Sequence, residues 1–200
     1  MGNQVAGVLL AAGEGKRLGT PKALVELGGR RLVDRAVDQL RDGGTAPVLV
    51  VTGAVPVTVP GVIAVPNPDW RTGMGSSLAA GLRALPGDCT AAVIALVDQP
   101  LIGADVVRRL LDAHQAGAEL AVAAYHGHPR NPVLLARGHW AGVLAAADGD
   151  AGARPYLRAH PGLVTLVECA DIGRPDDVDT PEDLARVSAL LAGGPAGPRT

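Results

Sequence analysis

The alternation of short apolar runs with helical patterns is the feature that most constrains the fold of this chain. The apolar runs rich in β-branched residues, which we interpret as strands, are residues 5–11, 47–53, 61–66 and 91–97. The amphipathic patterns that we interpret as helices are residues 31–44, 75–87 and 103–117. Near-continuous apolarity suits strands covered on both faces, and the alternation is typical of βαβ units around a parallel sheet. The sequence therefore predicts an α/β fold with one doubly wound, mostly parallel sheet.

The second half of the chain is less regular. Residues 119–126 and 131–138 read as two short strands joined by GHPR, which predicts a small inserted β-hairpin. A final helix is expected over residues 180–193, because Thr180, Pro181 and Asp183 suit an N-cap and the first turn of a helix. No polar linker divides the chain, so we expect one domain over residues 1–193 and a disordered tail over 194–200.

Composition excludes several classes of function. The net charge is −2 with acids and bases interspersed, which does not suit binding to DNA or RNA. No apolar run approaches the roughly 18 residues of a membrane span, so a membrane partner is not expected. Cys89 and Cys169 have neither disulfide-framework nor zinc-site spacing and are expected to be buried, which suits a cytoplasmic protein. With no phenylalanine, the core must be built from Val, Leu, Ala and Ile.

The segment LAAGEGKRLGTPK, residues 10–22, follows the first apolar run and therefore lies where open α/β sheets bind ligands. It matches neither the GxGxxG fingerprint nor the GxxxxGK(S/T) loop. Its glycines would still let backbone N–H groups approach an anion, and Lys16, Arg17 and Lys22 would supply positive charge. We expect it to bind a polyphosphate; a glycine-rich turn with solvated cations is the alternative.

Two aspartates suit a hard cation. Asp98 follows an apolar run and should emerge at the same edge of the sheet as the loop, and Asp179 offers a second carboxylate. Mg²⁺ takes one or two protein carboxylates together with phosphate oxygens and water. Asp98 could instead be a turn residue before Pro100, and Asp179 could serve only the dipole of the helix that follows.

The segment GMGSSL, residues 73–78, suits a nucleobase, because Gly73 and Gly75 allow close approach and Ser76 and Ser77 offer hydroxyls at the start of a helix. A serine N-cap after a flexible glycine run is the alternative. His126 and His128 form an HxH pair without a third ligand of evident spacing, so a solvated turn is favoured over a metal site.

Five segments along the chain form one set of motifs: LAAGEGKRLGTPK, NPDWRTGMGSSL (67–78), LVDQP (96–100), GDAGAR (149–154) and VDTPEDL (178–184). Together they resemble the MobA-like nucleotidyltransferases, and specifically the molybdenum cofactor cytidylyltransferases. The resemblance spans nearly the whole chain and implies a Rossmann-like nucleotidyltransferase fold. It also implies transfer of a nucleoside monophosphate to a phosphorylated acceptor, such as molybdopterin, with release of pyrophosphate.

The resemblance assigns roles by position. The catalytic residues would be Arg17, Lys22 and Asp98, and the Mg²⁺ ligands Asp98 and Asp179. The nucleotide would contact Leu10, Ala11, Ala12, Gly13, Gly15, Lys16, Lys22, Gly73, Met74, Ser76 and Ser77. The acceptor would contact Arg130, Asn131, Asp150 and Arg154. A molybdoenzyme or its chaperone would be a further partner.

The chain also departs from the family pattern. Gly75 stands where a serine is common, and RNPV (130–133) replaces the usual GHPV on the acceptor side. LAAG and Pro21-Lys22 match the cytidylyl branch, whereas the guanylyl branch tends to carry LAGG and Asp before its lysine, so CTP is the expected nucleotide. Ala12 adds a methyl group that should disfavour a purine. The alternatives are a sugar-phosphate nucleotidyltransferase and a catalytically silent protein that binds nucleotide or cofactor for delivery.

Overall fold

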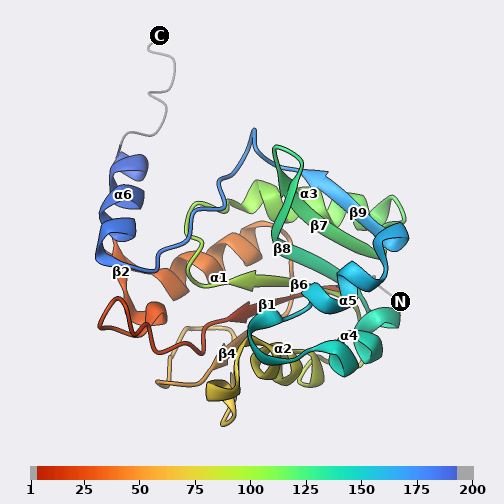
Figure 1. Cartoon of the computed structure of the whole chain (residues 1–200), viewed down its shortest axis with the longest axis horizontal. Helices are drawn as coiled ribbons and strands as arrows, with labels where there is room; N and C mark the ends of the chain where they lie inside the picture. The colour runs from red at the N-terminus through yellow and green to blue at the C-terminus, as the bar shows by residue number, and fades with distance from the viewer. Residues whose placement is uncertain (1–3, 193–200) are drawn as a thin grey trace.

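A seven-stranded sheet forms the centre of the computed structural model, which describes residues 4–192 (Figure 1). Its strands stand in the order β5-β4-β1-β6-β8-β7-β9. β8 runs antiparallel to both of its neighbours and the other pairings are parallel. The strands are β1 (Gln4–Leu10), β4 (Val48–Thr52), β5 (Ile63–Pro66), β6 (Cys89–Leu96), β7 (Leu120–Tyr125), β8 (His128–Ala136) and β9 (Val164–Glu168). The predicted α/β fold with a mostly parallel sheet is confirmed.

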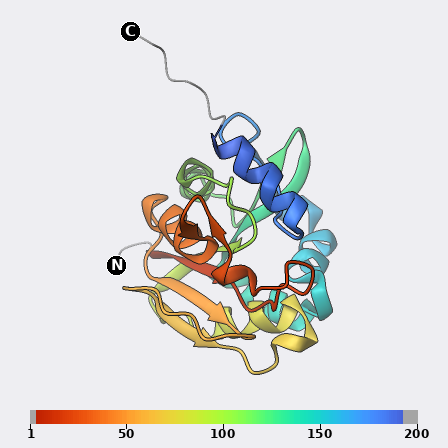
Figure 2. The same cartoon turned by 90° about the vertical axis from the view of Figure 1, so that its left-hand side faces the viewer.

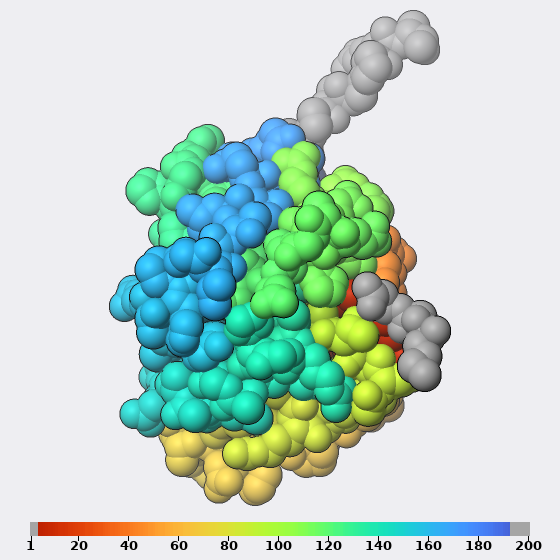
Figure 3. All heavy atoms as spheres, turned by 90° about the vertical axis from the view of Figure 1, so that its right-hand side faces the viewer, coloured from red at the N-terminus to blue at the C-terminus, as the bar shows by residue number. Residues whose placement is uncertain are grey.

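Helices cover both faces of the sheet. One apolar cluster joins one face to helices α1, α3 and α6, and a second joins the other face to α2, α4 and α5. The helices are α1 (Leu32–Asp42), α2 (Met74–Arg83), α3 (Ala104–Gln115), α4 (Trp140–Ala146), α5 (Arg154–Ala159) and α6 (Pro181–Ala192). Segments from α3 to β9 cover most of the face in Figure 3. None of the helices in residues 4–192 is both long and apolar enough to cross a membrane.

The chain changes direction across β1. After β1 it builds β4 and β5 on one side, and then it returns to place β6 on the other side of β1. This is the topological switch point, where the carboxyl ends of two parallel strands diverge and leave a crevice. Residues that follow β1 and β6 therefore meet there. A short pair of strands, β2 (Glu26–Leu27) and β3 (Arg30–Arg31), continues the loop after β1.

The predicted hairpin exists, but GHPR does not form its turn. His126 and Gly127 both have left-handed backbone angles, with φ of 52° and 77°, and they form the two-residue turn. Tyr125 then pairs directly with His128, so His128 to Arg130 belong to β8. The predicted turn was wrong. We placed it at GHPR because glycine and proline interrupt strands, but two residues with positive φ are enough to form a hairpin turn.

The final helix begins as predicted. The Thr180 hydroxyl accepts a hydrogen bond from the backbone N–H of Asp183 at 3.2 Å, and the Asp183 carboxylate accepts one from the N–H of Thr180 at 3.1 Å. This reciprocal pair is a capping box, and α6 starts at Pro181. In Figure 2, α6 lies alongside the loop that follows β1. The predicted tail, residues 194–200, lies outside the described residues.

Candidate active site

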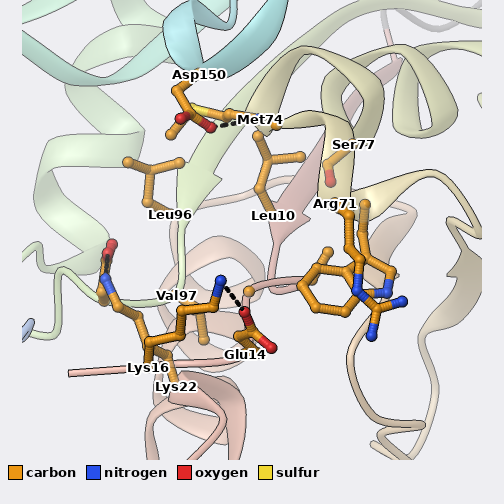
Figure 4. Close-up of a pocket in the computed structure, with 15 residues that line it drawn as sticks. Leu10, Glu14, Lys16, Lys22, Arg71, Met74, Ser77, Leu96, Val97 and Asp150 are labelled. Atoms are coloured by element: carbon orange, nitrogen blue, oxygen red, sulfur yellow. Dashed lines mark hydrogen bonds and ion pairs between the residues drawn. The ribbon is translucent and has the colours of Figure 1, made fainter. Parts of the chain in front are cut away.

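A cavity of about 490 Å³ opens at the switch point (Figure 4). Its volume lies within the range of about 300–1,000 Å³ that small-molecule sites occupy. In this view Lys16 and Lys22 lie on one side, and Ser77 and Arg71 on the other. The lining residues are Leu10, Ala12, Gly13, Glu14, Lys16, Lys22, Trp70, Arg71, Gly73, Met74, Ser77, Leu96, Val97, Asp98 and Asp150. They come from the ends of β1 and β6, the loops that follow these strands, the turn before α2, the start of α2 and the segment after α4.

The loop after β1 needs its glycine at position 15. Gly15 has φ of 63°, and a Cβ atom there would stand 2.0 Å from the carbonyl oxygen of Thr20. The N–H of Leu18 donates to the carbonyl of Gly15 at 2.9 Å, which closes the turn. Gly15 therefore shapes the loop without lining the cavity. Lys16 is largely exposed and pairs with Glu14 at 2.8 Å.

Lys22 stands between two carboxylates. Its Nζ donates to Oδ2 of Asp98 at 2.6 Å and also to Oδ1 of Asp179. Burial alone would lower the pKa of Lys22, but the two carboxylates outweigh it and raise the pKa above its usual value. The hydrogen bond from Lys22 lowers the pKa of Asp179, and Arg17, at 2.9 Å, adds to this effect. Both shifts favour the charged forms of Lys22 and Asp179 at neutral pH.

Asp98 is held by backbone as well as by charge. It lies two residues after the end of β6, and its carbonyl accepts a hydrogen bond from the N–H of Val178 at 2.8 Å. That bond brings Asp179 to the site from a segment 81 residues further along the chain. The second carboxylate oxygen of Asp98, Oδ1, is buried and has no hydrogen-bond partner among residues 4–192. Such an oxygen suits a ligand or a cation.

The start of α2 forms the opposite wall. Gly73 is its N-cap, with φ of 118°, and no side chain caps the helix, so neither serine acts as the N-cap that the alternative reading required. Ser77 lines the cavity, whereas Ser76 donates to the carbonyls of Asp69 and Gly73 and lies outside the lining. Gly75 is buried within the helix, against the backbone of Asp148.

The predicted acceptor residues fall into two groups. Asp150 lines the cavity and accepts from the N–H of Met74 at 3.3 Å, and Arg154 donates to the carbonyl of Asp150 at 3.1 Å. Arg130 and Asn131 lie at the beginning of β8, outside the lining. β8 runs antiparallel to β6 with Val133 opposite Ile94, so its beginning lies at the sheet edge from which Asp98 emerges.

Some predicted residues therefore lie outside the cavity lining: Ala11, Gly15, Arg17, Ser76, Arg130, Asn131, Arg154 and Asp179. Lining residues that we did not predict are Glu14, Trp70, Arg71, Leu96 and Val97. Trp70 and Arg71 belong to the NPDWRTGMGSSL segment, and the Arg71 guanidinium stacks over the Trp70 ring at 4.5 Å. Their position in that segment is the sequence feature from which their place in the cavity lining could have been predicted. No group of three or more metal-ligating side chains occurs among residues 4–192.

Comparisons with known proteins identify the family to which the chain is related. The MobA-like NTP transferase domain family matches residues 7–164. The chain is 42% identical over 198 residues to the nicotine blue oxidoreductase of Paenarthrobacter nicotinovorans, covering 92% of this chain and 96% of the relative. It is 34% identical over 197 residues to the molybdenum cofactor guanylyltransferase of Cereibacter sphaeroides, with the same coverage.

A solved structure shares the architecture. The structure of Rv0371c from Mycobacterium tuberculosis in complex with manganese has a TM-score of 0.74 and 26% identity, and the match covers 93% of this chain and 98% of that one. Because the family match spans most of the chain and these relatives match over nearly their whole length, this chain belongs to the MobA-like NTP transferase domain family of nucleotidyltransferases.

Proposed function

We propose that this protein transfers a nucleoside monophosphate, most readily CMP from CTP, to a phosphorylated acceptor such as molybdopterin and releases pyrophosphate. The observation that carries the proposal is the position of Lys22 between Asp98 and Asp179, beside a glycine loop and a cavity of nucleotide size. Nucleotidyl transfer needs one positive charge at the reacting phosphorus and a second positive charge near the departing pyrophosphate. Lys22 and Lys16 fit these two needs.

Mg²⁺ is the cofactor that we propose. The buried, unpartnered Oδ1 of Asp98 is an acceptor suited to a hard cation, and Asp179 would supply a second carboxylate. The manganese in the structure of the related Rv0371c is consistent with a divalent ion. Bound there, the ion would offset charge on the phosphates. Asp179 now pairs with both Lys22 and Arg17, so these cations would have to share it with the metal.

The residues of this chain have simple tasks in such a reaction. An oxygen of the acceptor phosphate attacks the α-phosphorus in line, and the bond from that phosphorus to the oxygen of the β-phosphate breaks. A phosphate monoester is largely dianionic at neutral pH, because its second pKa is about 6, so the attack needs no general base. Lys22 would neutralise charge at the α-phosphate, while Lys16, Arg17 and the loop N–H groups would hold the departing pyrophosphate.

The preference for CTP rests on Ala12 and the LAAG sequence. Ala12 is buried and lines the cavity, and its methyl group lies next to Gly53, where it takes up space that a glycine at position 12 would leave open. A smaller space should penalise a purine more than a pyrimidine. GTP is the main competitor, since relatives of this chain are named guanylyltransferases. Discrimination by shape is worth about 1–3 kcal/mol, so CTP should exceed GTP by about ten- to a few-hundredfold in kcat/KM.

Pyrophosphate release tests this proposal. The purified protein is incubated with Mg²⁺, molybdopterin and each of CTP, GTP, ATP and UTP, with reactions lacking the acceptor as controls. Acceptor-dependent release with CTP above the others supports it. A clear preference for GTP or ATP would overturn the cytidylyl assignment and leave nucleotidyl transfer intact. Release only when a sugar phosphate replaces molybdopterin would favour the sugar-phosphate alternative.

Oxidoreduction is the second candidate, because the relative named nicotine blue oxidoreductase is 42% identical, above the 34% of the guanylyltransferase. A reductase needs an electron donor, and the phosphates of a nicotinamide dinucleotide could use the same loop. Oxidation of NADH or NADPH in the presence of nicotine blue, followed by absorbance and without pyrophosphate release, would favour it. If the protein catalyses neither reaction but binds nucleotide tightly, a protein that delivers nucleotide or cofactor is favoured.

A further inference from the structure

Asn67 is a buried amide next to the cavity whose orientation is fixed by backbone. It follows β5 directly, and only 4% of it is exposed. Its Oδ1 accepts a hydrogen bond from the backbone N–H of Asp69 at 3.0 Å. A backbone N–H can only donate, so the oxygen of the Asn67 amide must face Asp69 and the nitrogen must face the other way.

The Asn67 nitrogen faces two serines. Nδ2 donates to Oγ of Ser76 at 2.9 Å and to Oγ of Ser77 at 3.0 Å, which uses both of its hydrogens. Each serine oxygen therefore accepts from Asn67 and keeps its own hydrogen to donate. Ser76 shares its single hydrogen between the carbonyls of Asp69 and Gly73, at 3.0 and 2.9 Å. For the Ser77 hydrogen, residues 4–192 provide no acceptor.

Ser77 differs from Ser76 in where it lies. Ser77 lines the cavity, and Figure 4 shows it on the wall opposite Lys16 and Lys22. Lys16 and Lys22, which would bind the phosphates, are thus across the cavity from Ser77. A nucleotide with its phosphates on the lysine side would have its base on the serine side.

We propose that Asn67 is a positioning residue that makes the Ser77 hydroxyl a hydrogen-bond donor to the base of the bound nucleotide, an inference that rests on the proposed function. The group it reads is an acceptor on the edge of the ring, either an unprotonated ring nitrogen or a carbonyl oxygen. Cytosine presents such an acceptor at N3, where uracil carries a hydrogen. Asn67 thereby sets the direction of a hydrogen bond that it does not itself make to the ligand.

The test uses a substitution that reverses the polarity of the buried amide. Asn67→Asp keeps the shape and the acceptor for the N–H of Asp69, but its second oxygen can only accept, so it draws the Ser77 hydrogen away from the cavity. Ser77→Ala removes the hydrogen altogether. Thr72→Ala is the matched control, since the Thr72 hydroxyl donates to the carbonyl of Asp69 in the same segment, outside the lining.

Affinities for two ligands distinguish a loss of base recognition from a general loss of binding. Dissociation constants are measured for the nucleoside triphosphate that the wild-type protein prefers and for inorganic tripolyphosphate, which has no base. Ser77→Ala and Asn67→Asp should each weaken nucleotide binding about three- to tenfold, the value of one hydrogen bond, and leave tripolyphosphate binding unchanged. The double variant should lose no more than either single variant, because both remove the same bond.

Three results would overturn the inference. They are unchanged nucleotide binding in Ser77→Ala, equal losses for nucleotide and tripolyphosphate, and a double variant whose loss is the product of the single losses. If Asn67→Asp does not fold by circular dichroism, Asn67→Ala replaces it in the cycle. Failure of the proposed function looks different: the wild-type protein would then bind nucleotide no better than tripolyphosphate and release no pyrophosphate, and the inference would fall with it.

Discussion

Lys22 donates to one oxygen of Asp98 at 2.6 Å, while the other oxygen of the same carboxylate is buried without a partner in the described part of the chain. The ion pair therefore leaves Asp98 half satisfied. A buried acceptor without a partner costs free energy, which a fold tolerates where a ligand later supplies the missing interaction. The site is in this sense prepared for a cation or a donor on the substrate.

Asp98→Asn should cut turnover by orders of magnitude and leave the melting temperature nearly unchanged. The amide has the same shape, and Asp179 remains to pair with Lys22, but the charge that would hold the metal is lost, and charge stabilisation of this kind is worth several kcal/mol. Pyrophosphate release and thermal unfolding are measured together, with the exposed Asp88→Asn as control. Near-normal turnover would remove Asp98 from the catalytic group.

Lys22→Ala should lower kcat more than it weakens nucleotide binding. A cation at the α-phosphate acts mainly on charge that develops in the transition state, so its removal raises the barrier more than it reduces ground-state affinity. Steady-state kinetics give the separation. Lys16→Ala is the comparison, because Lys16 is largely exposed and should affect KM more than kcat. An unchanged kcat with raised KM in Lys22→Ala would make Lys22 a ground-state binder.

Arg130→Ala should raise the KM for the acceptor and leave nucleotide affinity in place. Arg130 is exposed at the beginning of β8, at the sheet edge where Asp98 emerges, and a guanidinium is well suited to grip a phosphate. Kinetics with each substrate varied in turn check this, with the exposed Arg158→Ala as control. A raised KM for nucleotide alone would move this segment to the other substrate.

Acid should abolish the stabilising effect of Asp179. Its folded-state pKa lies below the ordinary value because Lys22 donates to it, so its contribution is present above the unfolded pKa of about 3.9 and is lost as pH falls through the lower folded value. The melting temperatures of wild type and Asp179→Asn should therefore differ by a constant amount from about pH 7 to pH 5, and this difference should shrink as pH falls below about 4. A difference that stays constant below about pH 4 would contradict the pairing.

Much of the fold could be predicted, because local patterns determine it. The strands over β1, β4, β5 and β6 and the helices α1, α2 and α3 differ from their predicted ranges by a few residues at each end. β9 and the short α4 and α5 were not predicted, because an edge strand and helices of about two turns carry little periodicity. The hairpin turn was misplaced because two residues with positive φ suffice to form it.

The sequence predicts the site less completely. Asp98 and Lys22 were expected together because both follow parallel strands, and they lie together. Asp179 was offered as a second carboxylate and was grouped with Asp98 through the resemblance, but spacing does not reveal how it reaches the site. The backbone hydrogen bond from Val178 to Asp98 brings it there. Which of two adjacent serines faces the cavity depends on the rotation of α2, and Asn67 was missed because a buried amide acts through its neighbours.

The bond between the N–H of Val178 and the carbonyl of Asp98 also makes assembly of the site a separate event from completion of the sheet. All the strands of the central sheet are complete by Glu168, yet Asp179 joins Lys22 only after the following segment has docked against the end of β6. The sheet can therefore be complete while the charge group of Lys22, Asp98 and Asp179 is not. Until the segment after β9 has docked, Lys22 has Asp98 as its single carboxylate partner, so the geometry of the group depends on a segment that contributes no strand to the sheet.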